Sequence, residues 1–143
     1  MLNAIHGQFS VRWCDQVCLV VLRGSFNREG VMALSSAVRQ AWQDAGKPAQ
    51  WAHVMDLRLW EGGTPESFAI ARELVTWTVA HGVAAIVRIH HGNFLSRVTE
   101  RQGVLDDTGV PVVEFSSPEE TWQWLDSRHL PCDACRALLA DAG

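Results

Sequence analysis

Side chains able to bind ligands or to move protons gather where three of the predicted strands end. In open α/β sheets, ligands bind at the carboxyl ends of the parallel strands. A carboxylate and an imidazole there could act as a general base and a general acid. The set comprises Asp56, Arg58, Trp60, His90, His91, Ser116 and Ser117. Because consecutive residues of a strand point to opposite faces, only one of the two histidines can enter a given site.

The sequence has no recognisable catalytic motif near these strand ends. A serine hydrolase needs its nucleophile on a sharp turn such as Gly-x-Ser-x-Gly, and the sequence has no such motif. We therefore expect no catalytic residue and no cofactor. A small enzyme that pairs Asp56 with His90 or His91 stays open as an alternative, and it requires two of these groups within hydrogen-bond reach.

Two glycines and a threonine precede a predicted helix. Gly62, Gly63 and Thr64 could bind an anion, because free N–H groups and the helix dipole favour negative charge at a helix start. Glu61 and Glu66 flank this segment and would repel an anion. A tight turn with a threonine cap is therefore the favoured interpretation.

The four cysteines are interpreted as thiols. The first residues lack the pattern of a signal peptide, and the longest apolar run, 17–22, is shorter than the roughly 20 residues that cross a bilayer. We therefore expect a cytoplasmic protein without a transmembrane segment, in which disulfides are rare.

The tail is the weak candidate for a metal site, through His129, Cys132 and Cys135. Cys14 and Cys18 fail as a second ligand pair, because they face opposite sides of the predicted hairpin. We favour no metal and expect the tail helix to pack its thiols onto the domain.

Strand and helix patterns alternate along the chain. Phe9, Val11 and Trp13 match Leu22, Val20 and Cys18 across a two-residue turn, which predicts an antiparallel hairpin. After Gly24–Asn27, the sequence predicts helices over 28–45, 65–80, 94–107, about 118–128 and 131–142. Further strands are predicted over 51–59, 83–90 and 110–115, with a loop at Gly62 and Gly63.

This order predicts a single α/β domain with a mixed sheet of about five strands. The hairpin adds an antiparallel edge, and the other neighbours are parallel and joined by right-handed crossover helices. We expect the domain to span 7–128 and a helical tail to span 129–143.

Composition restricts the class of partner. The net charge is −4, so nucleic acid is not expected as a partner. Seven tryptophans and no tyrosine are present. Trp60, Trp122 and Trp124 are the ones we expect at an interface, because tryptophan is enriched there.

Several short segments together resemble the SpoIIAA-like, STAS-type domains (sulfate transporter and anti-sigma-factor antagonist). The similarity spans 7–128 and extends to the stand-alone bacterial branch related to lipid-binding CRAL-TRIO domains. The segments are Leu22-Arg23-Gly24-Ser25-Phe26, Met55-Asp56-Leu57-Arg58, Glu61-Gly62-Gly63-Thr64-Pro65, Phe115-Ser116-Ser117-Pro118-Glu119-Glu120 and Trp124-Leu125.

The resemblance implies a regulatory or ligand-binding module that is not an enzyme. In antagonist members, a serine at the start of the helix after the aspartate-bearing strand is phosphorylated. The usual Asp-Ser-Ser-Gly is replaced here by Thr64-Pro65-Glu66-Ser67, so Thr64 and Ser67 are the candidates.

Three functions follow. The first is a non-enzymatic module that binds a protein partner or a small ligand and forms a homo-oligomer. The second is a carrier of a lipid or apolar small molecule, which predicts an apolar cavity beside the helices of Phe68 and Phe94. The third is the small enzyme.

Overall fold

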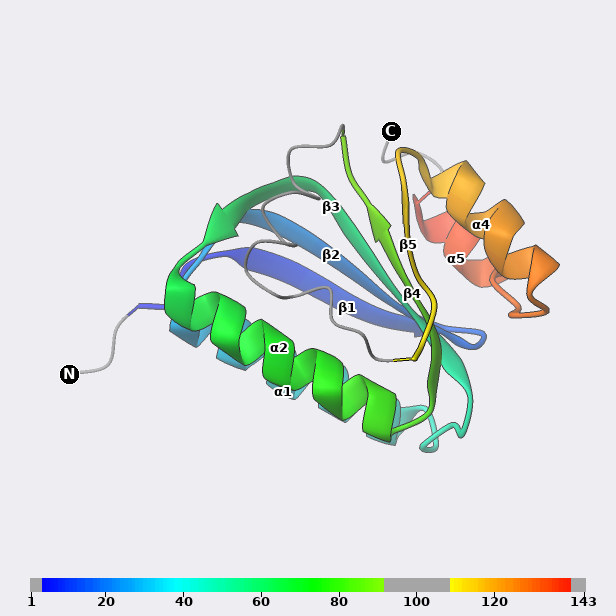
Figure 1. The fold of residues 1–143 in the computed structure, drawn as a ribbon, viewed down its shortest axis with the longest axis horizontal. Coiled ribbons are helices and arrows are strands. Elements are labelled where there is room, and N and C mark those ends of the chain that lie inside the picture. Colours follow the sequence, from blue (N-terminus) through cyan, green and yellow to red (C-terminus); the bar gives the residue numbers. More distant parts are fainter. Residues whose placement is uncertain (1–3, 92–108, 140–143) are drawn as a thin grey trace.

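The computed structural model describes residues 4–91 and 109–139. They form a single α/β domain around a five-stranded sheet with the strand order β1-β2-β3-β4-β5 (Figure 1). β1 and β2 are antiparallel, and the other neighbours are parallel. The predicted fold class is confirmed. The helix predicted over 94–107 lies outside the described residues.

The elements follow the predicted order. The strands are β1 (Gln8–Cys14), β2 (Val17–Phe26), β3 (Trp51–Gly63), β4 (Val83–Ile89) and β5 (Val112–Phe115). The described helices are α1 (Arg28–Asp44), α2 (Pro65–Ala80), α4 (Pro118–Ser127) and α5 (Asp133–Leu139).

The hairpin has the predicted register. Phe9 pairs with Leu22, and Trp13 pairs with Cys18. Asp15 occupies the turn with φ 52°, a left-handed conformation that aspartate tolerates better than most residues. Matching of the two apolar faces therefore determines this register.

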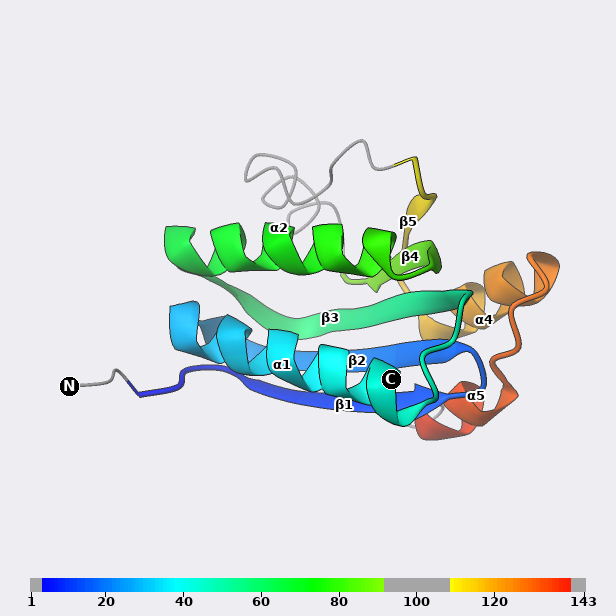
Figure 2. The ribbon, with the colours of Figure 1, turned by 90° about the horizontal axis from the view of Figure 1, so that it is seen from below.

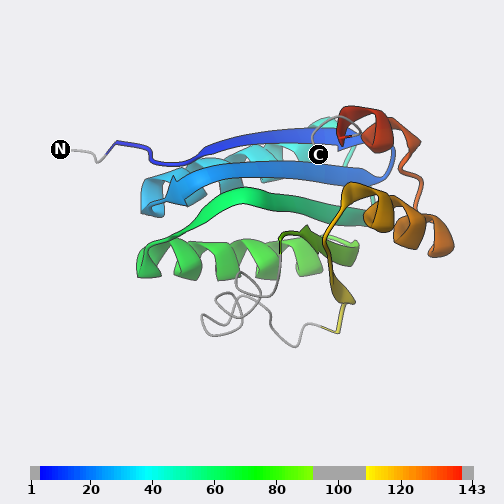
Figure 3. The ribbon, with the colours of Figure 1, turned by 90° about the horizontal axis from the view of Figure 1, so that it is seen from above.

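Helices cover both faces of the sheet. α1 and α2 lie side by side over one face (Figures 2 and 3), and they bury Val38, Leu74 and Trp51 among others. α4 and α5 lie together at one end of the sheet on the other face. Strands β2 and β3 are buried on both sides, which explains their nearly continuous apolar sequences.

Three helix caps agree with the sequence. The side chains of Asn27, Thr64 and Ser117 accept hydrogen bonds from the N–H groups of Gly30, Ser67 and Glu120. Each oxygen satisfies a backbone donor that has no partner inside the helix. Asn27 also bonds the chain before β1, at Ala4 and His6.

Two predicted breaks are wrong. β2 continues to Phe26, and β3 continues through Gly62 and Gly63. The reason is that β3 contains two irregularities, at each of which two of its residues stand opposite one residue of β2. Such bulges interrupt the alternation of side chains while strand pairing continues on either side.

The thiol interpretation is wrong for two cysteines. Cys14 at the end of β1 and Cys135 in α5 form a disulfide across 121 residues of sequence. Cys18 and Cys132 are free and buried. Burial raises the pKa of each of these thiols to about 12, so both stay protonated near neutral pH and are poor nucleophiles.

The tail helix packs on the domain. Cys132, Cys135 and Leu139 join the apolar core on the α4–α5 face. Trp122 is only 1% exposed in the same core, so it is not an interface residue as we expected. Trp124 is partly buried beneath Arg128. α5 begins at Asp133, two residues after the predicted start.

None of the described helices is both long enough and apolar enough to cross a membrane.

Reduction of the Cys14–Cys135 disulfide is expected to destabilise the protein. A covalent link across so long a loop restricts the unfolded chain, and its loss typically costs about 2–5 kcal/mol. Urea unfolding with and without dithiothreitol measures this change. The Cys135→Ser variant should match the reduced protein and should not respond to dithiothreitol. A wild-type chain with the same stability in both conditions would contradict the expectation.

Candidate functional site

The carboxylate of Asp56 is fully engaged by its neighbour Arg58. The guanidinium donates to both carboxylate oxygens, Nε to Oδ1 and Nη2 to Oδ2, each at 2.9 Å. The backbone N–H of Arg58 also donates to Oδ1, at 3.1 Å. The Asp56 side chain is 6% exposed and the Arg58 side chain is 8% exposed. These bonds raise the pKa of Arg58, and they leave Asp56 without an oxygen free for proton transfer.

The Asp56–Arg58 contact lies at the first irregularity of β3. Val21 pairs with Asp56 and Arg23 pairs with Leu59, so β3 uses one residue more than β2 here. As a result, Leu59 points to solvent and is 57% exposed. Trp60 lies on the side covered by α1 and α2. Its ring packs edge-on against the Phe68 ring, with 6.0 Å between the ring centroids.

The second irregularity brings β3 to the start of α2. Gly62 has φ +96°, a left-handed conformation that glycine adopts without steric cost. Gly63 pairs with Phe26, and a Cβ on Gly63 would collide with the Ser67 hydroxyl. We call residues 56–66 the β3–α2 rim.

The two predicted phosphorylation candidates differ in exposure. Thr64 caps α2 and is partly exposed. Ser67 is 3% exposed, and its hydroxyl donates to the carbonyl of Thr64 at 2.7 Å. Only Thr64 is therefore accessible in the folded protein.

The other residues predicted at the strand ends do not lie beside Asp56. Asp56 follows Ala52 and Val54 on the face of the sheet that α4 and α5 cover. His90 lies beside Glu114, with Nε2 3.3 Å from Oε2. Glu114 points to the opposite face, because Val113 and Phe115 on either side of it pack toward α4 and α5. His91 is exposed. Ser116 and Ser117 both donate to Glu120. No hydrogen bond joins Asp56 to a histidine in the described part of the chain.

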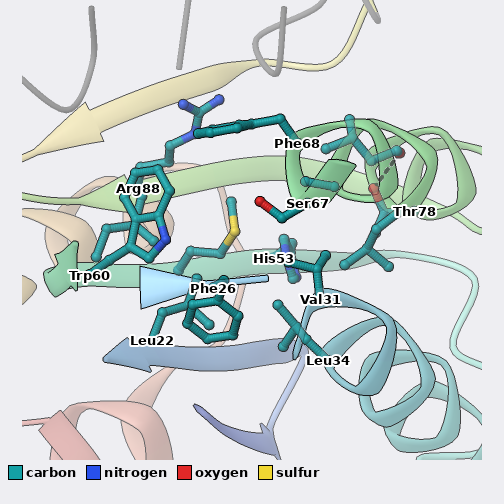
Figure 4. A pocket seen from close by; sticks show the side chains of 15 residues that line it. Leu22, Phe26, Val31, Leu34, His53, Trp60, Ser67, Phe68, Thr78 and Arg88 are labelled. Atoms are coloured by element: carbon teal, nitrogen blue, oxygen red, sulfur yellow. Dashed lines mark hydrogen bonds between the residues drawn. The ribbon is translucent and has the colours of Figure 1, made fainter. Parts of the chain in front are cut away.

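An apolar cavity of about 80 Å³ lies between the sheet and helices α1 and α2 (Figure 4). Most of its walls are aliphatic or aromatic, from β2, β3 and both helices. The polar side chains at its walls are His53, Ser67, Thr78 and Arg88. The carrier hypothesis predicts a cavity beside the helices of Phe68 and Phe94. Phe68 lines this cavity, and Phe94 lies outside the described residues.

His53 stands out within this cavity. It is 2% exposed, and its Nδ1 has no hydrogen-bond partner. Burial, and secondarily the positive charge of Arg88, lowers the pKa of His53 to about 4. The imidazole is therefore neutral near pH 7, with one nitrogen that donates and one that accepts.

Arg88 marks one side of the cavity. It is 2% exposed, and its Nη1 lies 3.9 Å from Glu114 Oε1. Glu114 thus lies near both Arg88 and His90. This ion pair compensates a charge that would otherwise be costly to bury.

Sequence reasoning missed His53, Arg88 and Glu114. A signal was present, because each interrupts an apolar strand with an ionisable residue: Trp-Ala-His-Val, Val-Arg-Ile and Val-Glu-Phe. A buried ionisable group needs a partner or a function. Within 4–91 and 109–139, no cluster of three His, Cys, Asp or Glu side chains could hold a metal ion.

Comparisons with known proteins identify the fold. No model of a known family and no curated protein sequence matches the chain. Among solved structures, it is similar to an uncharacterized protein from Shewanella loihica with a SpoIIAA-like fold (TM-score 0.64, 12% identity, covering 87% of this chain and 98% of that one). It is also similar to an anti-sigma factor antagonist from Mycobacterium paratuberculosis (TM-score 0.55, 18% identity, 85% and 95%). The chain has the SpoIIAA-like, STAS-type fold that the sequence resembles.

The stability of the protein should fall as pH is lowered from about 6.5 to about 4. The unfolded chain binds a proton at His53 near pH 6.5, whereas the folded chain does so only near pH 4. Unfolding is thus favoured in this window, by up to about 3 kcal/mol. Urea unfolding at several pH values measures the slope. His53→Leu should flatten it and His91→Leu should not. Equal slopes in all three proteins would refute the assignment.

Removal of the Arg58 side chain should strongly destabilise the β3–α2 rim. Arg58→Ala leaves the buried carboxylate of Asp56 without its partner, which typically costs about 3–5 kcal/mol. Arg58→Lys keeps the charge but loses the two-point geometry, so it should lose less. Urea unfolding of both variants provides the comparison. Wild-type stability in Arg58→Ala would show that the contact is dispensable.

Proposed function

We propose that this chain is a non-enzymatic regulatory module that binds a protein partner through the β3–α2 rim. The observation that carries the proposal is the exposed Leu59, held on a backbone segment that internal contacts fix on both sides. Asp56 and Arg58 hold the segment before it, and the Thr64 cap holds the segment after it. A preformed surface loses little entropy on binding.

The chemistry around Leu59 suits a protein. Glu61 and Glu66 are exposed on the same segment, so the rim offers one apolar side chain between acidic ones. A partner with an apolar pocket bordered by basic residues would complement it. The likeness to an anti-sigma factor antagonist, a protein named for its action on another protein, supports the same class of function.

The geometry argues against the enzyme alternative. Both oxygens of Asp56 are bonded to Arg58, and the carboxylate and His90 occupy opposite faces of the sheet. General acid–base catalysis requires such groups within reach of one substrate.

Thr64 is the residue through which we propose that binding is regulated. Its hydroxyl sits at the exposed start of α2, where added negative charge is favoured by the helix dipole. Phosphorylation there would add charge to the acidic rim and change its electrostatic match to a partner.

Loss of a partner in the Leu59→Glu variant tests the proposal. Tagged wild-type and variant chains are used to capture proteins from lysates of the cells that naturally contain this chain. We expect a specific protein to be retained by the wild type and lost with Leu59→Glu, because a charge replaces the apolar contact. Leu138→Glu is the matched control, since Leu138 is 44% exposed on α5, outside the rim.

Three outcomes decide the proposal. A partner lost with both variants, or with neither, would contradict a role for the rim. A partner lost also with Thr64→Glu would support regulation through that hydroxyl. If the captured protein is a second copy of the chain, light scattering should show a dimer that Leu59→Glu dissociates.

A second candidate function is transport or sensing of a small apolar molecule. The cavity beneath α1 and α2 favours it, because cavities of this kind are few in a protein and are the usual sites of ligands. This function uses the interior of the domain and is independent of the rim.

A further inference from the structure

His53 places an unsatisfied polar group in an apolar cavity. More than nine-tenths of buried polar groups have a partner, and one without a partner typically costs about 1–3 kcal/mol. His53 Nδ1 is buried, and no group in the described part of the chain bonds to it. Figure 4 shows the ring on β3, between residues of α1 and α2 that line the cavity. The site therefore lacks a hydrogen-bonding group at this atom.

The nearby hydroxyls do not supply that group. Ser67 donates its proton to the carbonyl of Thr64, and Thr78 donates to the carbonyl of Val75, both at 2.7 Å. Each hydroxyl has a single proton, so neither can also donate to His53. Neither hydroxyl oxygen accepts from Nδ1 either, because that atom has no partner among the described residues. Arg88 is engaged with Glu114.

The charges around the cavity select a neutral molecule. A cation would be repelled by Arg88, whose charge already acts on His53. An anion would have to leave water for an apolar site in which Arg88 already has a carboxylate beside it. A hydroxyl group fits, because it can donate to a bare imidazole nitrogen or accept from an N–H group, whichever form Nδ1 takes.

We propose that the cavity binds a small neutral molecule with an apolar body and one hydroxyl group, which hydrogen-bonds to His53. This inference rests on the second candidate function and names the class of ligand. The apolar body would contact Leu22, Phe26 and Leu34 among the lining residues. An engineered cavity of about 150 Å³ binds benzene, so this cavity of about 80 Å³ must enlarge to admit an aromatic ring. The unbranched side chain of Met55 can move to enlarge the cavity.

Phenol and toluene are matched probes, since a hydroxyl replaces a methyl group of similar size. Both are titrated into the wild-type protein and the His53→Leu variant, and binding is followed by calorimetry and by NMR of the imidazole nitrogens. We expect the preference for phenol over toluene to fall about tenfold in His53→Leu. In the wild type, phenol should shift the Nδ1 resonance of His53, whereas toluene should not.

Filling the cavity provides the control. Ala71 lines the cavity, so Ala71→Leu should abolish binding of both probes. Ala69 is on the same helix but does not line the cavity, so Ala69→Leu should leave binding unchanged. Circular dichroism confirms that each variant is folded. Phenol binding that persists in Ala71→Leu would place the probe elsewhere and overturn the inference.

The remaining outcomes separate the two hypotheses. If both probes bind and His53→Leu does not change their ratio, the cavity accepts apolar molecules but the hydroxyl class is wrong. If neither probe binds to the wild type, the inference and the second candidate function both fail.

Discussion

The end of the domain that carries the β3–α2 rim depends on the extra length of β3 relative to β2. At two places, two residues of β3 stand opposite one of β2, and each place has its own physical support. The Asp56–Arg58 contact holds the first, and the left-handed backbone of Gly62 allows the second. The first irregularity turns Leu59 outward and Trp60 toward Phe68. The second delivers Thr64 to the start of α2. The exposed rim and the wall of the cavity are therefore two sides of one distorted strand.

Local patterns predicted most of the fold, because they rest on interactions between residues close in sequence or directly paired. The hairpin register follows from matched apolar faces, and the caps at Asn27, Thr64 and Ser117 follow from oxygen-bearing side chains before helices. The features that escaped prediction depend on distant residues. Gly62 and Gly63 resemble a loop unless the pairing of Gly63 with Phe26 is known. The disulfide joins residues that only the packing of α5 on the sheet brings together.

The candidate site shows the same division. The rim residues were identifiable because strand ends are readable from sequence, but their roles were not. Asp56 resembles a catalytic carboxylate in sequence and is an internal partner of Arg58 in the fold. His53 lies inside an apolar strand, and only the arrangement of α1 and α2 shows that it borders an apolar cavity. The rim and the cavity meet at α2, since Thr64 caps the helix whose first turn supplies Ser67 and Phe68 to the cavity.

The disulfide between Cys14 and Cys135 also determines how the protein responds to mechanical tension. A pull on Met1 and Gly143 would pass along the first residues, across the two sulfur atoms and out through the last residues. Strands β2 to β5, the cavity and the rim lie within the closed covalent loop, whereas β1 precedes Cys14 and would bear the load. In the oxidised protein, extension would therefore stop once β1 had separated from β2 and the residues after Cys135 had straightened. Once the bond is reduced, the same tension would act on the packing of α5 and on the sheet itself.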